Sequence, residues 1–260
     1  MAYFYNYPLI NYQFGSETYP VTFQDISAYV DIIDNIKDDI SFYIKYTILE
    51  GDRADIVSKK IYGSPDFYFT FYMMNDNIRE RGWPLSSRDL EDRILLNHPN
   101  FVVTTKDNIS DKLLVGTQIA GNSSGAVGTI IKRNLDLGQL IIKLNAGSVN
   151  FVKDEVITHD TGSGLETATT SSATKEFLST HHYVDGDLRW RDVDPFQDPP
   201  AIYTPVTVED HYGDQNNELK EIRIIKPDSM QTVYRAFQEA LASWVNLDQT
   251  LRLILILGLH

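Results

Sequence analysis

Few residues in the chain have the types and spacing of a catalytic site. The clearest motif is a G-x-S-x-G pattern, and its surroundings do not favour a catalytic serine. Gly121, Ser123 and Gly125 satisfy the G-x-S-x-G pattern of a serine nucleophile. That pattern works when a strand precedes the serine and a helix follows it. Here the β-prone residues 126–130 follow the serine, so the sequence predicts a hairpin turn and no catalytic residue.

A second group combines histidine and aspartate, which are metal-ligand types. Its members are His181, His182, Asp185, Asp187, Asp192 and Asp194. The Asp-Gly-Asp at 185–187 lacks the remaining ligand spacing of a calcium loop, including the terminal Glu. Two adjacent histidines on a regular strand or helix cannot both face one ion without distortion. The pattern favours a solvated acidic loop, and we expect no metal site.

Composition narrows the function classes further. The chain has 260 residues, of which 42% are hydrophobic, enough for one large or two small domains with real cores. Its net charge of −13 repels phosphate groups, so we expect neither nucleic acid nor an anionic membrane as a partner. The absence of cysteine excludes disulfides, thiolate nucleophiles and cysteine-bound metals. We expect no cofactor.

The sequence also lacks targeting and membrane signals. The first seven residues have neither the basic nor the aliphatic region of a signal peptide. The longest apolar run, Leu253 to Leu257, is far shorter than the ~20 residues that span a bilayer. We therefore expect no signal peptide and no membrane span.

Residues 1–45 are interpreted as an aromatic N-terminal arm followed by a helix. The first 23 residues hold too many aromatic side chains for a solvated arm, and an extended aromatic arm suits a partner surface. We expect partner contacts from Tyr3, Phe4, Tyr5, Tyr7, Tyr12 and Phe14. From Asp25 to Tyr46 apolar side chains recur every three or four residues, which predicts a helix.

The next block has dense local signals. Residues 46–49 alternate like a strand, and Asp52 follows a turn where its carboxylate can cap a helix. Ile56, Lys60 and Ile61 share one side of that helix. Gly63 lies where a left-handed C-cap is needed, and Ser64-Pro65-Asp66 restarts a second helix. Phe67, Phe71 and Met74 fill one face of this second helix.

This block resembles the LysM module, whose signature is a strand, a Gly-Asp turn, an Ile-centred helix, a Tyr-Gly cap and a closing Asn. The matching residues are Tyr46, Gly51-Asp52, Ile56, Tyr62-Gly63 and Asn75, and Trp83-Pro84-Leu85 resembles the ending of tail-associated versions. The resemblance places a LysM-like domain at 46–100. It implies a groove for N-acetylglucosamine glycans formed by Glu50, Gly51, Asp52, Arg53, Met74, Asn75, Asp76 and Asn77. The alternative is that these are only cap and turn residues.

The flanking segments extend the resemblance. An aromatic arm, a helix leading into Tyr46, the LysM-like block and a terminal strand plus helix are similar to baseplate wedge subunit 53 of contractile-tailed phages. The likeness covers roughly residues 1–100 and 215–242. Members of that family sit in one of six equivalent wedges around a central hub. They join neighbouring wedges through protein contacts and have no catalytic role.

The rest of the chain departs from the shorter members of that family. Short β-prone runs separated by turn residues predict a β-rich insertion at 101–175, folded as a small barrel or sandwich. Its Thr-, Ser- and Gly-rich end, 161–175, is typical of a flexible exit. Residues 176–260 are interpreted as an irregular loop region, then strand 221–225, a helix and an apolar tail. The tail, residues 251–259, is either a buried terminal strand or a strand added to a partner's sheet.

The sequence thus predicts an α+β protein that acts as a structural subunit of a phage tail baseplate wedge. Its expected partners are other wedge proteins in a sixfold assembly, and its expected location is the virion tail, assembled in the host cytoplasm. The competing hypothesis is a peptidoglycan-binding module of LysM type. A peptidoglycan-degrading enzyme is a third class, but no paired-carboxylate motif, cysteine nucleophile or zinc-ligand spacing supports it.

Overall fold

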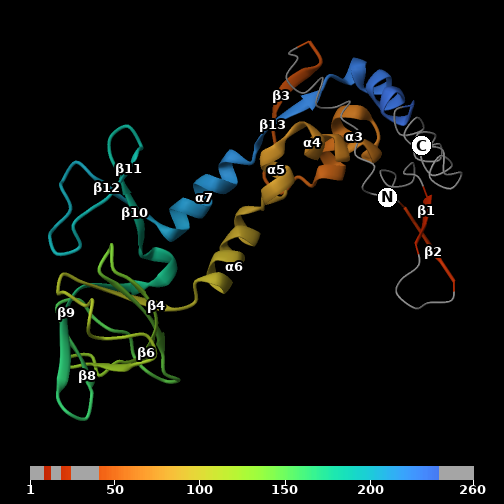
Figure 1. Ribbon diagram of the computed structural model, residues 1–260. Helices are drawn as coiled ribbons and strands as arrows, with labels where there is room; N and C mark the ends of the chain where they lie inside the picture. Colours follow the sequence, from red (N-terminus) through yellow and green to blue (C-terminus); the bar gives the residue numbers. More distant parts are fainter. Residues whose placement is uncertain (1–8, 13–18, 25–40, 240–260) are drawn as a thin grey trace, which may run out of the picture. The chain divides into compact units, whose positions relative to one another are not determined.

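The computed structural model describes residues 9–12, 19–24 and 41–239, and the fold is α+β with several sheets (Figure 1). The chain forms two compact units, one from residues 1–86 and 216–260, the other from residues 87–215. These units cut across the expected boundaries, because residues 87–100 belong to the second unit and residues 216–260 to the first. Tyr3, Phe4, Tyr5, Tyr7, Phe14 and the 251–259 tail lie outside the described residues.

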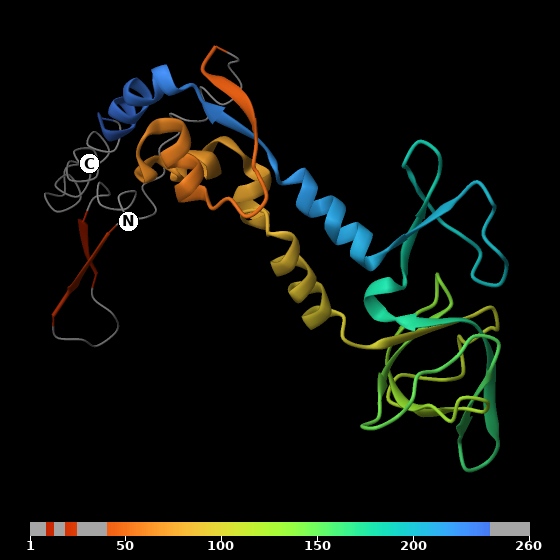
Figure 2. The same cartoon turned by 180° about the vertical axis from the view of Figure 1, so that it is seen from behind.

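The first unit is closed by two strands that lie far apart in the sequence. Strand β3 (Tyr43–Thr47) pairs antiparallel with β13 (Glu221–Ile225), in a register that places Tyr43 opposite Ile225. The two strands lie side by side, orange against blue, in Figures 1 and 2. Strand β3 begins three residues before the predicted strand at Tyr46. The predicted helix over 25–46 is therefore wrong at its end, where Tyr43 and Ile44 are extended; residues 25–40 lie outside the described part.

Helices fill the space against this sheet. They are α3 (Ala54–Tyr62), the 3₁₀ turn η1 (Pro65–Phe67), α4 (Phe69–Met74) and α5 (Asp76–Arg81), and residues 227–239 are also helical. Gly63 ends α3 at φ 75° and donates its N–H to Lys59 O, which confirms the predicted left-handed cap. Pro65 opens η1, and the Ser64 hydroxyl accepts from Asp66 N. The predicted restart of a helix is confirmed.

The predicted capping of α3 by Asp52 is wrong. The N-cap is Arg53, without a side-chain cap bond, because the Asp52 carboxylate instead binds Lys60 Nζ at 2.7 Å. Val57 faces the core and is fully buried, whereas Ile56 is exposed. The face of α3 that is buried therefore carries Ala54, Val57 and Ser58, and the side that carries Ile56 and Lys60 is exposed.

The core of the first unit joins residues from both ends of the chain. One cluster comprises Ile48, Ala54, Val57, Phe71, Ile78, Leu219, Ile222 and Ile224. A second comprises Phe67, Phe69, Met73, Met74, Ile225, Met230, Val233 and Phe237. The predicted apolar face of Phe67, Phe71 and Met74 is buried. Val233 and Phe237, whose helical spacing in the sequence places them on one face of the helix after β13, are also buried.

Near the N-terminus, β1 (Leu9–Tyr12) and β2 (Val21–Gln24) form an antiparallel hairpin in which Leu9 lies opposite Gln24. The side chains of Leu9 and Tyr19 are 69% and 79% exposed, and Val21 and Tyr12 are also exposed. A two-stranded hairpin is marginally stable in water without further packing.

The second unit begins with α6 (Ser87–Asn97), a short helix that the spacing of Leu90, Ile94 and Leu95 in the sequence predicts, and continues into a closed barrel. The strands are β4 (Phe101–Thr105), β5 (Gln118–Gly121), β6 (Val127–Asn134), β7 (Gln139–Leu144), β8 (Val156–Asp160) and β9 (Leu165–Lys175). Their order around the barrel is β4-β7-β6-β5-β8-β9. Of the two alternatives that the sequence leaves open, the structure shows the barrel.

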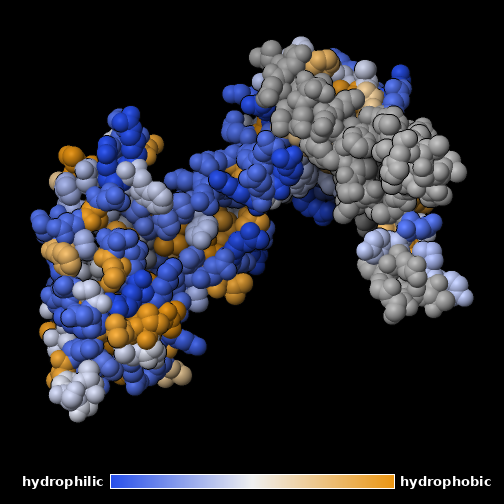
Figure 3. All heavy atoms as spheres, in the orientation of Figure 1, coloured by the Kyte–Doolittle hydropathy of each residue, from blue (hydrophilic) through white to orange (hydrophobic). Residues whose placement is uncertain are grey.

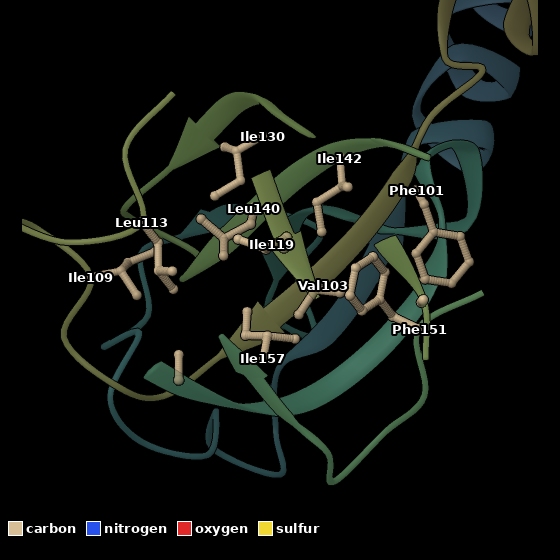
Figure 4. Close-up of a cluster of buried hydrophobic side chains, with 12 residues drawn as sticks. Phe101, Val103, Ile109, Leu113, Ile119, Ile130, Leu140, Ile142, Phe151 and Ile157 are labelled. Carbon is tan, nitrogen blue, oxygen red and sulfur yellow. The ribbon is translucent and has the colours of Figure 1, made fainter. Parts of the chain in front are cut away.

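Large aliphatic and aromatic side chains fill the barrel (Figure 4). Ile130, Leu140, Ile142 and Ile157 are fully buried there. The predicted flexible exit over 161–175 is wrong, because β9 occupies most of it. This strand pairs with β8 on one side and β4 on the other, so its small and β-branched residues close the barrel.

The predicted irregular region also has regular structure. After the 3₁₀ turn η2 (Glu176–Leu178), strands β10 (Thr180–Val184), β11 (Trp190–Arg191) and β12 (Thr204–Thr207) form a sheet in the order β11-β10-β12. Helix α7 (Val208–Glu218) follows. No helix within the described ranges is both long and apolar enough to cross a bilayer.

A buried carboxylate fixes one end of the barrel. Glu155 is 1% exposed, and its oxygens accept hydrogen bonds from Val152 N at 2.7 Å, Ser124 N at 3.0 Å and Ser124 Oγ at 2.9 Å. A Cβ on Gly121 would lie 2.5 Å from the Glu155 carboxylate, so glycine leaves room for it. Burial by itself raises the pKa of Glu155, but these hydrogen bonds outweigh it and the pKa is lowered.

We expect Glu155→Gln to lower the free energy of unfolding by about 1–3 kcal/mol, because an amide nitrogen would then face backbone donors in a buried site. Thermal unfolding measures the loss, and amide hydrogen exchange at Ser124 and Val152 locates it. Glu91→Gln on the exposed face of α6 is the matched control. Equal stability of the two variants would contradict the role given to Glu155.

The same carboxylate predicts a pH dependence. Because its native pKa is lower than that of an unfolded Glu, about 4.3, its contribution is complete above that value and is lost as the pH falls toward the native pKa. The stability difference between wild type and Glu155→Gln should therefore shrink as the pH drops below about 4. Unfolding measured at a series of acidic pH values gives this difference directly, and a constant difference would refute it.

Candidate functional site

The predicted groove residues separate into two groups in the structure. Met74, Asn75, Asp76 and Asn77 line an open cavity of about 470 Å³ next to the β3–β13 sheet. Its other walls are Lys45, Glu221, Ile222 and Arg223. Glu50, Gly51, Asp52 and Arg53 do not line it. The structure therefore brings together half of the predicted site and adds four residues that the sequence did not indicate.

Asn75 has a structural task at the base of this cavity. Its side-chain Nδ2 donates to Phe71 O and to Arg223 O, both at 2.8 Å, and its Oδ1 accepts from Arg223 N at 2.7 Å. The amide thus bonds both backbone groups of one residue in β13, as a neighbouring strand would. Both of its donor hydrogens are used within the protein, which leaves none for a ligand.

The turn residues 50–53 are held by contacts of their own. Trp83 Nε1 donates to Asp52 O at 2.6 Å, and Lys220 Nζ lies 3.6 Å from a Glu50 carboxylate oxygen. Gly51 has φ 75°, a conformation that favours glycine. Arg53 pairs with Asp55 at 3.2 Å. These contacts correspond to the cap-and-turn interpretation of the segment.

The cavity carries mixed charge and no catalytic pair. Asp76 is paired with Arg79 at 2.7 Å, Glu221 accepts from Thr47 Oγ1 at 3.0 Å, and the Arg223 guanidinium lies 5.2 Å from the Tyr43 ring centroid. The lining residues include no serine, histidine or aromatic side chain. Such a surface can offer hydrogen bonds and charges to a partner, and its lining residues include no Ser–His or Cys–His pair.

The other chemical candidates have structural explanations. Ser123 lies in the hairpin turn between β5 and β6, where Gly125 N donates to Gly121 O, as the sequence predicts. Its N–H faces Glu155 Oε2 at 3.3 Å. The contacts described for Ser123 and Ser124 include no histidine, and the carboxylate that accepts from the Ser124 hydroxyl, Glu155, is buried and also binds backbone N–H groups.

The aspartates of the 185–194 loop stabilise turns. Asp185 accepts from Asp187 N and Arg189 N and pairs with Arg191 at 2.6 Å. The hydrogen bond from Arg189 N and the Arg191 guanidinium hold the pKa of Asp185 below its usual range. Asp194 accepts from Phe196 N at 2.9 Å. The nearby pair His181 and His182, however, is joined by His211 from α7, a residue that no local motif could indicate.

We expect Asn75→Ala to lower the free energy of unfolding by about 1–3 kcal/mol, because it leaves the backbone N–H and C=O of Arg223 without these partners. Amide hydrogen exchange at Arg223 should accelerate. This local change distinguishes loss of the Asn75–Arg223 hydrogen bonds from a general loss of stability. Asn77→Ala in the same cavity wall is the matched control and should change stability by less than about 0.5 kcal/mol. Unchanged exchange at Arg223 in Asn75→Ala would rule out the strand-like role.

Comparison with known proteins gives this chain no family. No protein-family model matches the chain, and no curated protein matches it. A role for the chain therefore has to be argued from its own residues and their geometry.

Proposed function

We propose that this chain is a structural subunit of a contractile phage tail baseplate wedge and joins neighbouring wedges through protein contacts. It has no catalytic role in this proposal, and its place is the tail of the virion. Its partners are other wedge proteins arranged around a sixfold axis. The proposal begins from the resemblance of residues 1–100 and 215–242 to that family and is supported by two features of the fold.

The first feature is the pairing of β3 with β13 around helices α3 and α4, which supports the LysM-like arrangement that the resemblance implies. Strand β3 is followed by α3, η1 and α4, and β13, which comes in the chain only after α5 and the second unit, pairs antiparallel with β3. Tyr62 of the Tyr-Gly cap donates its hydroxyl to Ile225 O at 2.9 Å and stacks on Phe71. Asn75, the closing Asn, bonds Arg223. The residues that carry the resemblance are thus the ones that hold β13 in place.

The second feature, which carries the proposal, is the exposed apolar surface of the β1–β2 hairpin. Leu9, Tyr19 and Val21 are large apolar or aromatic side chains with most or much of their surface in solvent. Val21 lies opposite Tyr12 in the strand register, and Phe23, two residues further along β2, is on the same face and 40% exposed. An exposed apolar face of this kind is typical of a protein–protein interface. Tyr12, one of the predicted arm residues, is also on this hairpin and 54% exposed.

The glycan-binding alternative receives less support from the cavity. Both side-chain N–H groups of Asn75 donate to backbone oxygens of the protein, and the lining residues include no aromatic ring on which a sugar face could stack. The turn residues 50–53, which would form the other wall of a LysM groove, do not line it. The cavity is better explained as the space left between α5 and the edge of the sheet.

The decisive experiment is to purify tails from a phage that encodes this chain and to count its copies by quantitative mass spectrometry. We expect six copies per tail, co-purifying with the other baseplate proteins. A Val21→Asp/Phe23→Asp double variant, with both changes on the same exposed face of the hairpin, should enter tails at least tenfold less, because two charges would have to be buried at the interface. Circular dichroism checks that the variant folds.

The matched control is Leu165→Asp. Leu165 is 68% exposed on the barrel, and Figure 3 shows that apolar residues are exposed there in patches between hydrophilic ones. This control should enter tails normally. Absence of the chain from tails, together with saturable binding of N-acetylglucosamine oligomers that Asn77→Ala abolishes, would replace the wedge proposal with the glycan-binding one.

A further inference from the structure

Three imidazoles converge in the second unit. His181 and His182 are consecutive in β10, yet their Nδ1 atoms are only 3.0 Å apart. The ring of His211, from α7, stacks on His181 with 4.0 Å between centroids. One nitrogen from each of the three rings lies within 4.8 Å of the other two. Within the described ranges, this is the one group of three metal-ligating side chains gathered so closely.

The strand contains the distortion that lets two neighbouring histidines face the same point. In the pairing of β10 with β12, the register shifts between Thr180 and His182. An irregularity of this kind changes the direction of a side chain and is common beside functional sites. The expectation that adjacent histidines could not share an ion assumed a regular strand, and β10 is not regular at His181.

We propose that His181, His182 and His211 bind one divalent transition-metal ion, of which zinc is the first candidate. Zinc–nitrogen bonds of about 2.0–2.1 Å in tetrahedral geometry put two ligand nitrogens about 3.3 Å apart. The His181 and His182 nitrogens are already near that spacing. All three side chains are only partly buried, so modest rotations can bring the third nitrogen closer.

The donor set selects the class of metal. Three imidazole nitrogens without a carboxylate or thiolate suit zinc, copper or nickel rather than magnesium or calcium, which prefer oxygen. Burial, followed by the neighbouring imidazoles of His211 and His182, lowers the pKa of His181 to about 4. Burial and His211 also lower the pKa of His182, although Asp214 acts in the opposite direction. These shifts favour the neutral form of both rings, which is the form that binds a metal.

Residues around the three histidines affect the orientation of the rings and the access of ligands to the site. The Gln215 side-chain nitrogen lies 2.9 Å from His211 Nε2. With this amide turned over, its oxygen would accept the Nε2–H and orient the ring so that Nδ1 can bind the ion. An open cavity of about 720 Å³ has His181, His182 and Trp190 in its walls. Three protein ligands leave the fourth tetrahedral position open on this side for water or for a ligand from a partner. The site stands independently of the wedge proposal.

The test uses the full chain without a histidine tag, stripped of metal with a chelator and then dialysed. Calorimetric titration with Zn²⁺ should show one saturable site per chain. Titration with Co²⁺ should produce the visible absorption of a tetrahedral nitrogen-ligated ion, and Zn²⁺ should displace it. The ring of Trp190 lies 4.3 Å from that of His182, so Cu²⁺ should also quench its fluorescence.

Two variants keep the test decisive if one of them fails to fold. His211→Asn and His182→Asn should each weaken Zn²⁺ binding at least tenfold and abolish the rise in melting temperature that Zn²⁺ gives the wild type. The matched control is His159→Asn, in barrel strand β8, whose ring contacts Gln118 O instead of another histidine. It should bind Zn²⁺ like the wild type. No saturable binding in the wild type, or binding that His211→Asn and His159→Asn affect equally, would overturn the proposal.

Discussion

The antiparallel pairing of β3 with β13 is the constraint on which the first unit depends. It joins residues 43–47 to residues 221–225, so the two ends of the segment between these strands must lie close together. Two strands by themselves bury too little apolar surface to be stable. The sheet persists because Ile222, Ile224 and Ile225 pack against the helices that follow β3, and because Asn75 bonds the backbone of Arg223 as a further strand would.

This constraint also explains how a second unit can be carried in the middle of the chain. A segment whose ends are close together can hold a separately packed domain without disturbing the fold that flanks it. Residues 87–215 have their own core, built inside a closed barrel that has no free strand edge. Closure also makes the barrel independent of a partner for its backbone hydrogen bonds.

Polar groups decide the details within each unit. Asn75 in the first unit and Glu155 in the second are both buried, and the side chain of each hydrogen-bonds to backbone groups of another segment. Such side chains favour one local backbone conformation. A buried donor or acceptor left without a partner costs more free energy than its hydrogen bond contributes when it is formed. The histidine group differs in kind. His181, His182 and His211 contact one another and Trp190, so their mutual arrangement is what suits them to a shared ion.

The sequence by itself determined the features that depend on neighbouring residues. The Gly63 cap, the restart at Ser64-Pro65, helix α6, the hairpin turn at 121–125 and strand β13 were all predictable, because a few adjacent residues set their backbone conformation. The buried face of Phe67, Phe71 and Met74 followed from helical spacing alone.

Only the tertiary structure decided the features whose partners are distant in the sequence. The helical spacing of Tyr43 and Ile44 gave way to a strand because β13 offers them hydrogen bonds. The Thr- and Ser-rich segment 165–175 became a barrel strand because β4 and β8 bind both of its edges. His211 joined His181 and His182 because α7 packs against an irregular strand. Local spacing does not record such pairings, since their free energy comes from contacts between segments that the sequence keeps apart.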